Sequence, residues 1–313
     1  MFPAFPYDHF ALLSDRDIDA LYAFFMTRTP VRQVNRDNTL PFPLNIRFLQ
    51  AGWKLLFFRP PEPQNAISQT AEARGHYLVD GIAHCGACHT PRNALGAEIA
   101  GRAMDGADID GWTAPALNGN TPSPTGWRAS DFYDYLRTGS SRLHGTAAGT
   151  MSPVVHQGLA KLPDDDIQAI SQYLVTLGGG SSALQEAAET RSLEQDAAKS
   201  SSSLATPGER LYVTACATCH FNAGEKVADA RPELGLNSAL FLEKPNNLLH
   251  AVLEGVSAED GKPGVVMPAF RAMTDRDLAE IAKYLRSTRT DLPTWTDLEE
   301  RVARTRSAGA AHD

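Results

Sequence analysis

The stretch Cys85-Gly86-Ala87-Cys88-His89 recurs as Cys216-Ala217-Thr218-Cys219-His220, and the two copies contain every cysteine of the 313-residue chain. In each copy two residues separate the thiols, and a histidine follows directly. A Cys-x-x-Cys pair alone is found in thioredoxin-type redox sites and as half of a zinc site, whereas the added histidine is typical of c-type haem attachment. These three chemistries are the starting alternatives.

The context of the two motifs favours haem. A thioredoxin-type site needs strands around a helix, but the patterns on both sides of each motif are helical. A zinc site needs four ligands close together, and the two pairs stand in separate repeats. In haem attachment the two thiols bind the porphyrin covalently and the histidine binds the iron. The sequence therefore predicts two haems c, with these attachment and iron-binding residues: Cys85, Cys88 and His89, and Cys216, Cys219 and His220.

A second repeat occurs three times, each time beginning at a methionine in a proline-containing loop. The copies begin at Met1, Met151 and Met267. Each continues through acidic residues into an apolar stripe of helical spacing, and the acidic residues complement the positive N-terminus of a helix. The sequence thus predicts three closing helices but only two haem sites.

Middle helices are predicted between each haem motif and the following methionine. Residues 130–139 and 246–255 each begin with a polar residue and end at a glycine. Ser130 and Asn246 are expected to cap the helix N-termini, and Gly139 and Gly255 to lie just past the ends.

The repeat places methionine sulfur at the sixth position of each iron. We expect Met151 to bind the first iron and Met267 the second, which would fill both axial positions and leave electron transfer as the available chemistry. Histidine is the alternative ligand at these positions, from His144, His156 or His250.

Two prolines follow the haem motifs at corresponding places. The backbone carbonyl of Pro115 or Pro232 is a candidate acceptor for the Nδ1–H of the iron-binding histidine, which would fix the ring orientation. The alternative is that both are simple turn prolines. Trp112 and Tyr212 are expected either to pack on the haem or to fill the core.

Composition and charge exclude some partners. The formal net charge is −8, so no basic surface is expected to bind nucleic acid. No apolar run reaches the roughly 18 residues that suggest a membrane span. The most apolar stretch, residues 46–58, contains Arg47 and Lys54 and is expected to be a core or interdomain strip.

The N-terminus does not read as a secretory signal, because residues 1–25 carry charges throughout. Covalent haem attachment of this kind nevertheless takes place outside the cytoplasm. We therefore expect the sequence to be a fragment whose parent has a signal peptide and a first haem module before Met1.

The expected organisation has five parts. These are a remnant of a first module with its connection (residues 1–62), a haem module (63–177), a linker (178–206), a second haem module (207–291) and a charged tail (292–313). Within the linker, residues 183–199 are a candidate helix. Within the tail, residues 295–313 are a candidate short helix.

Taken together, the motifs resemble the multihaem cytochrome c subunits of bacterial membrane-associated dehydrogenases. The resemblance rests on residues 85–92 (CGACHTPR), 111–115 (GWTAP), 149–155 (GTMSPVV) and 266–270 (VMPAF), and it extends to residues 1–53. It implies an all-α fold of tandem class I cytochrome c modules, two complete and one remnant. It also implies three haems in the full-length parent.

The resemblance further implies a role and a location. Such subunits are not enzymes by themselves. They take electrons from a quinoprotein, flavoprotein or molybdenum hydroxylase catalytic subunit and pass them to ubiquinone or an oxidase, at the periplasmic face of the inner membrane. Two alternatives stay open: a dihaem peroxidase, which needs an open distal side on one haem, and a soluble electron shuttle without a fixed partner.

Overall fold

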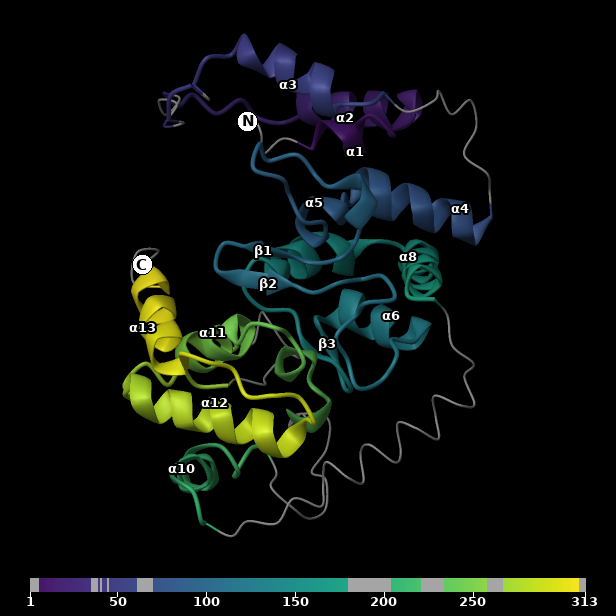
Figure 1. Ribbon diagram of the computed structural model, residues 1–313. Coiled ribbons are helices and arrows are strands. Elements are labelled where there is room, and N and C mark those ends of the chain that lie inside the picture. The colour runs from purple at the N-terminus through teal and green to yellow at the C-terminus, as the bar shows by residue number, and fades with distance from the viewer. Residues whose placement is uncertain are drawn as a thin grey trace.

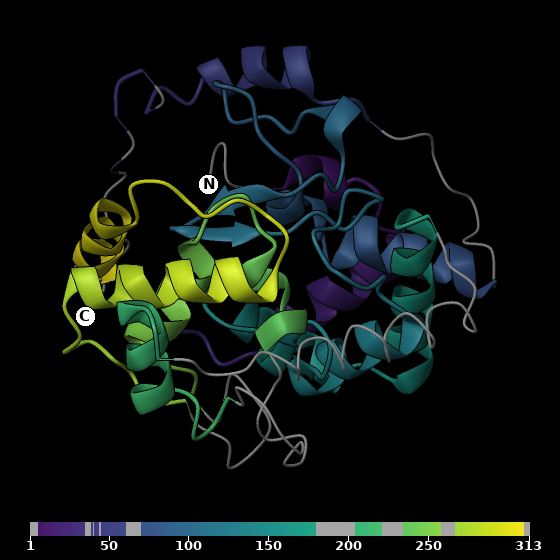
Figure 2. The same ribbon diagram turned by 60° about the horizontal axis from the view of Figure 1, so that its bottom comes forward.

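The computed structural model describes residues 6–34, 39, 41–43, 45–60, 70–179, 204–220, 234–257 and 267–309. It is mostly helical, as the sequence predicts, with two very short antiparallel hairpins. Two helical bundles lie side by side, and a layer of three N-terminal helices covers the first bundle (Figures 1 and 2). The predicted linker helix at 183–199 and Pro232 lie outside the described residues.

The first bundle is built around a crossing of its first and last helices. Its helical elements are α4 (Ala71–His76), the π-helical turn η1 (Tyr77–Ile82), α5 (Gly86–His89), η2 (Ala100–Arg102), α6 (Ala129–Thr138), α7 (Met151–Pro153), η3 (Val154–Gly158), η4 (Leu159–Lys161) and α8 (Asp164–Leu177). Its hairpins are β1 (Ala107–Ile109) with β2 (Trp112–Ala114), and β3 (Ser140–Ser141) with β4 (Gly145–Thr146). α4 and α8 bury an apolar core that includes Val79, Ile167 and Ile170.

The second bundle repeats this plan. It contains α10 (Pro207–Ala215), η5 (Leu234–Leu236), η6 (Ser238–Leu240), α11 (Asn246–Glu254), α12 (Asp275–Arg289) and α13 (Leu298–Gly309). α10 packs on α12 as α4 packs on α8. The core includes Tyr212, Leu249 and Leu285, all nearly inaccessible to water.

Glycine marks the same crossing in both bundles. An added Cβ at Gly75 would lie 2.2 Å from the backbone oxygen of Ala169 on α8. At Gly208 it would lie 2.2 Å from the backbone oxygen of Glu280 on α12. The absence of a side chain therefore permits the close approach of the first and last helices in each bundle.

The predicted helix ends are only partly right. Gly139 and Gly255 follow α6 and α11 with φ of 79° and 78°, as expected of glycines past a helix end. The predicted N-caps are wrong, because Ser130 and Asn246 lie inside the first turns. Arg128 is the N-cap residue of α6. Its backbone N–H donates a hydrogen bond to the carboxylate of Asp131 at 3.0 Å.

The C-terminal segment is more than a charged tail. α13 packs against α11 and α12, and it contributes Leu298 and the fully buried Val302 to the second core. Arg306 donates a hydrogen bond to Asp275 at the start of α12. The apolar positions on one face of α13 outweigh its high charge, so residues 298–309 belong to the second bundle.

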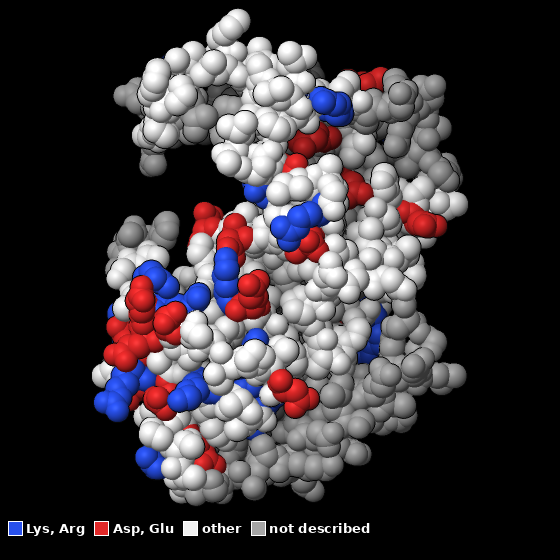
Figure 3. Space-filling view, in the orientation of Figure 1, with Lys and Arg blue, Asp and Glu red and all other residues white. Residues whose placement is uncertain are grey.

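The N-terminal layer consists of α1 (Tyr7–Phe10), α2 (Asp15–Met26) and α3 (Leu49–Phe57). Of the two expectations for residues 46–58, the core strip is wrong, because α3 has no buried residue and Leu55 is 79% exposed. The interdomain alternative stays a prediction, and Nε1 of Trp53 donates to the backbone oxygen of Leu95 in the first bundle at 2.9 Å. The face shown in Figure 3 carries little charge over this layer, whereas mixed charges gather over α12 and α13. Within the described part of the chain, no helix has the length and apolarity needed to cross a membrane.

His9 attaches this layer to the first bundle. Its Nδ1 donates to the backbone oxygen of Asp80 at 2.6 Å, and its Nε2 lies 3.0 Å from Glu98. Burial by itself would lower the pKa of His9, but the hydrogen bond and charge of Glu98 and the bond to Asp80 together raise it. The partners of the buried histidine therefore favour its charged form.

This shift predicts a pH-dependent attachment. Because the folded pKa is raised, the stabilisation is fully present below the unfolded pKa of about 6.5 and is lost as pH rises through the folded value. Hydrogen exchange over residues 7–26, corrected for intrinsic rates, should show weaker protection at high pH. The change should vanish in Glu98→Gln, and equal protection at both pH values would contradict the assignment.

Candidate functional site

The first motif forms a tight turn at the end of η1. His84 adopts a φ of 41°, and Cys85 then begins α5, which carries Cys88 and His89. Cys85 is half-buried against the first core, whereas Cys88 is exposed. The thiol of Cys85 thus lies on the core side of the turn, and the thiol of Cys88 lies on the surface.

Burial governs the pKa values of the two half-buried thiols. Burial, with a smaller effect from the charge of Asp80, raises the pKa of Cys85 to about 12, and burial raises that of Cys216 to about 11. Reactive and metal-binding cysteines instead have lowered pKa values. Among the described residues no three His, Cys, Asp or Glu side chains are grouped to hold a metal ion. The raised pKa values are opposite to the lowered pKa that activates a thioredoxin-type thiol.

His89 presents one nitrogen for a ligand. It is 8% exposed, and its Nδ1 lies 2.7 Å from the backbone oxygen of Pro115. A carbonyl only accepts, so Nδ1 carries the proton and Nε2 holds the lone pair. Burial lowers the pKa of His89, and the opposing bond to Pro115 does not reverse this, so the ring stays neutral as iron ligation requires. The carbonyl of Pro115 thus lies at hydrogen-bond distance from Nδ1 of His89, and its role toward a haem stays a prediction.

Gly106 shapes the same loop. Its N–H donates to the backbone oxygen of His89 at 2.8 Å, and its φ is 84°. An added Cβ would lie 2.9 Å from the backbone nitrogen of Ala116. The residues just before and after the β1–β2 hairpin are therefore both hydrogen-bonded to His89.

Met151 is brought to the same cluster as Cys85. It stands two residues after Gly149, whose φ is 56°, and packs against the first core, as Leu117 and Trp127 also do. In the second bundle Cys216 and Met267 likewise pack on one cluster, and the backbone of Met267 pairs with Val256 through two hydrogen bonds of 3.0 Å. Each attachment turn therefore shares an apolar cluster with its predicted methionine.

Two of the three alternative histidines are engaged elsewhere. His144 stacks on Trp127 at 3.9 Å between ring centroids, with Nδ1 3.0 Å from the hydroxyl of Ser123. His250 stacks on Trp112, with Nδ1 2.7 Å from Glu254. The buried Nε2 of His156 has no hydrogen-bond partner among the described residues, and the same holds for the Nε2 of His144, which lies 3.6 Å from Asp131.

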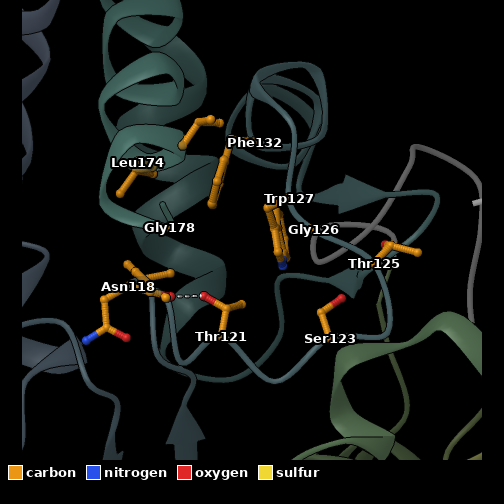
Figure 4. Close-up of a pocket in the computed structure, with 12 residues that line it drawn as sticks. Asn118, Thr121, Ser123, Thr125, Gly126, Trp127, Phe132, Leu174 and Gly178 are labelled. Atoms are coloured by element: carbon orange, nitrogen blue, oxygen red, sulfur yellow. Dashed lines mark hydrogen bonds between the residues drawn. The ribbon is translucent and has the colours of Figure 1, made fainter. Parts of the chain in front are cut away.

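A cavity of about 190 Å³ adjoins the first cluster. Its walls are the loop from Leu117 to Trp127, Phe132 of α6 and the C-terminal end of α8, as Figure 4 shows. The Oγ1 of Thr125 on this wall is buried without a partner among the described residues. The lining is mixed, with polar Asn118, Thr121 and Ser123 opposite apolar Phe132 and Leu174, and Cys85, His89 and Met151 are not part of it.

The second motif is described less completely. Cys216 follows α10 half-buried, Cys219 is exposed and His220 is half-buried. The hydroxyl of Tyr212 donates to the backbone oxygen of His220, so the buried Tyr212 supports the turn from the core. Pro232 cannot be compared with Pro115, because residues 221–233 lie outside the described ranges.

The hairpin β1–β2 was not predicted, nor was the stacking of Trp112 on His250 of the second bundle. Asp110 and Gly111, with φ of 49° and 83°, form its turn. An Asp-Gly pair is a strong hairpin signal, because both central residues of a type I′ turn need positive φ. That pair was the signal that could have revealed the hairpin.

Comparison with known proteins points to one family. The family model described as cytochrome c matches residues 72–178 and 205–289. A nicotinate dehydrogenase subunit of Pseudomonas putida is 41% identical over 317 residues, which cover 100% of this chain and 26% of that protein.

Two further relatives have similar identity. The gluconate 2-dehydrogenase cytochrome c subunit of Pantoea cypripedii is 35% identical over 310 residues, covering 91% of this chain and 68% of that protein. The fructose dehydrogenase cytochrome subunit of Gluconobacter japonicus is 35% identical over 309 residues, covering 92% of this chain and 63% of that protein. The chain thus spans about a quarter of the first relative and about two thirds of these two.

Proposed function

The chain belongs to the cytochrome c family, and we propose that it passes electrons through two covalent haems c, from a dehydrogenase catalytic subunit to a further acceptor. The observation that carries the proposal is the shared plan of the two bundles, each with a Cys-x-x-Cys-His turn and a methionine on one cluster. Three relatives named for dehydrogenases support the partner.

Each predicted site residue has a role in attaching the haem or in binding its iron. When bound, haem iron supplies one-electron oxidation and reduction. Cys85 and Cys88, and Cys216 and Cys219, hold the porphyrin. His89 and His220 bind the iron, and Pro115 orients His89 through Nδ1. Met151 and Met267 would hold the iron through their sulfur, and a thioether ligand would raise the potential and keep oxygen and peroxide from the iron.

A peroxidase is the enzyme alternative, and optical spectra decide between the two. The carrier proposal expects a methionine–iron charge-transfer band of full strength at both haems, no carbon monoxide binding in the reduced protein and two one-electron steps in a redox titration. A haem that lacks the band and turns over peroxide would support the peroxidase.

Attachment is tested by Cys219→Ser. Because one thioether then remains at most, we expect covalent haem to be weakened or lost in the second bundle alone. Mass spectrometry and haem staining of the denatured chain measure it. The matched variant Cys88→Ser should affect only the first bundle. Unchanged haem content in both variants would contradict attachment at these turns.

A protein that carries electrons needs an electron donor and an electron acceptor. We propose a quinoprotein, flavoprotein or molybdenum hydroxylase as electron donor, ubiquinone or an oxidase as acceptor, and a place on the periplasmic face of the inner membrane. The test is purification of the native protein, followed by addition of nicotinate, gluconate, fructose or ethanol without oxygen. Reduction of the haems by one substrate, with a large catalytic protein that co-purifies, supports a fixed partner. A chain that purifies alone favours a shuttle.

An exposed face of α2 supports a third haem in the parent protein. Ile18 and Leu21 correspond in the repeat to Ile167 and Ile170 of α8, which are buried in the first core. On α2 they are 47% and 46% exposed. We propose that a further haem-binding half covers this face. Three haems per polypeptide in the protein isolated from its natural cell would support this, and two would contradict it.

A further inference from the structure

The β1–β2 hairpin connects the first haem turn to the second bundle. At the His89 end, Gly106 donates to the backbone oxygen of His89, and Pro115 accepts from its Nδ1. Between these residues the strands pair in the register Ala107↔Ala114 to Ile109↔Trp112. The hairpin is therefore anchored to the predicted iron ligand, and its turn reaches away from it.

The far end of the hairpin docks on α11. The Trp112 ring stacks on His250, with 4.7 Å between centroids and 19° between planes. The side-chain amide of Asn247 accepts a hydrogen bond from the backbone N–H of Thr113 and donates one to the backbone oxygen of Thr113, both at 2.8 Å. Paired amide bonds of this kind fix an orientation as well as a distance, so α11 holds the hairpin in one position.

On its other side α11 supports the second methionine. The N–H of Phe270 donates to the backbone oxygen of Val252 at 2.9 Å, and Val256, just past the helix, pairs with Met267. A continuous set of contacts thus runs from His89 through Pro115 and Trp112 to His250, and along α11 to Met267.

Trp112 fits this junction without spare room. An added Cβ at Gly149, in the loop before Met151, would lie 2.2 Å from the Trp112 ring. An added Cβ at Gly111 would lie 3.2 Å from Nε2 of His250. The indole is therefore enclosed between the methionine loop of the first bundle and the middle helix of the second.

We propose that the stacked pair of Trp112 and His250 is the junction across which electrons pass between the two haem sites, and that Asn247 is a positioning residue that keeps the pair in contact. The proposal rests on the carrier function proposed above. In the step one electron leaves the reduced iron of one bundle, which is oxidised, and reduces the oxidised iron of the other. No bond forms or breaks, and no proton is transferred.

The experiment follows electron exchange between the haems in the full-length, haem-loaded chain. Pulse radiolysis delivers less than one electron per molecule, and the haem absorbance then reports the redistribution. In Trp112→Leu we expect the exchange rate to fall by about tenfold or more, because a displacement of about 1 Å at a reacting contact can cost up to ~100-fold. Trp112→Phe keeps a stacked ring and should lose less than about threefold.

Two asparagines on α11 provide a matched comparison. Asn247→Ala removes both bonds to Thr113 and should slow exchange, whereas Asn246→Ala changes the neighbouring residue of the same turn and should not. The double variant of Trp112→Leu with His250→Leu should be no slower than Trp112→Leu alone, because the two rings act as one contact.

Haem content, the methionine–iron band and both midpoint potentials are measured in every variant. If these stay constant while exchange slows, the junction is supported. If exchange is unchanged in Trp112→Leu and Asn247→Ala, the junction is overturned while the carrier function stands. If exchange slows only where the band or a potential is lost, the role of Trp112 is structural and the proposal fails. Loss of the carrier function itself would show in the unmodified protein, as a missing band.

Discussion

Replacing Gly75 with valine should lower the melting temperature of the first bundle by roughly 10–25 °C, from a loss of about 3 kcal/mol or more. The cause is overpacking at a helix crossing. Even a methyl group would lie 2.2 Å from the backbone oxygen of Ala169 and 2.7 Å from Cβ of Tyr173, so α4 would have to move away from α8. A backbone oxygen in a packed helix cannot turn aside as a flexible side chain can.

Thermal unfolding followed by far-UV circular dichroism and by haem absorbance measures this effect. Gly208→Val should damage the second bundle in the same way, since its Cβ would meet Glu280 and Tyr284. Gly101→Val is the control, because nothing lies within 4 Å of an added Cβ there. We expect its effect to stay within about 0.5 kcal/mol. A normal melting temperature for Gly75→Val would show that the two helices do not cross at this glycine.

The repeat explains why much of the fold could be predicted. Ile167 and Ile170 of α8 occupy the same stripe as Leu278 and Ile281 of α12, and both pairs are buried. One pattern seen several times is stronger than any single amphipathic helix. The predicted carbonyl of Pro115 also lies at hydrogen-bond distance from His89, because a proximal histidine needs a fixed tautomer.

What was missed depends on contacts between distant segments. No local signal requires Asn247 to bind Thr113 of the other bundle, and Asn246, expected as a cap, lies inside the first turn of α11. The role of Gly75 follows from its distance to Ala169, which helical periodicity does not report. The burial of Val302 likewise depends on where α13 lies relative to α12.

Replacing Met151 with alanine should open the first iron to carbon monoxide. The methionine sulfur is the predicted sixth ligand, and loss of a thioether ligand lowers the potential. We expect a fall on the order of 0.1 V, within the ~0.8 V range that axial ligands span. The methionine–iron band should lose about half of its intensity, since the second haem keeps Met267, and covalent haem should be retained.

Two other variants make this test specific to the ligand. Met26→Ala alters an exposed methionine on α2 and should leave the band and the potential unchanged. His156→Ala addresses an alternative histidine whose buried Nε2 has no hydrogen-bond partner in the described chain, a property it shares with His144. If His156 were the ligand, His156→Ala would admit carbon monoxide and Met151→Ala would not. The opposite result is expected, because Met151 packs on the same cluster as Cys85, as Met267 packs with Cys216 in the second bundle.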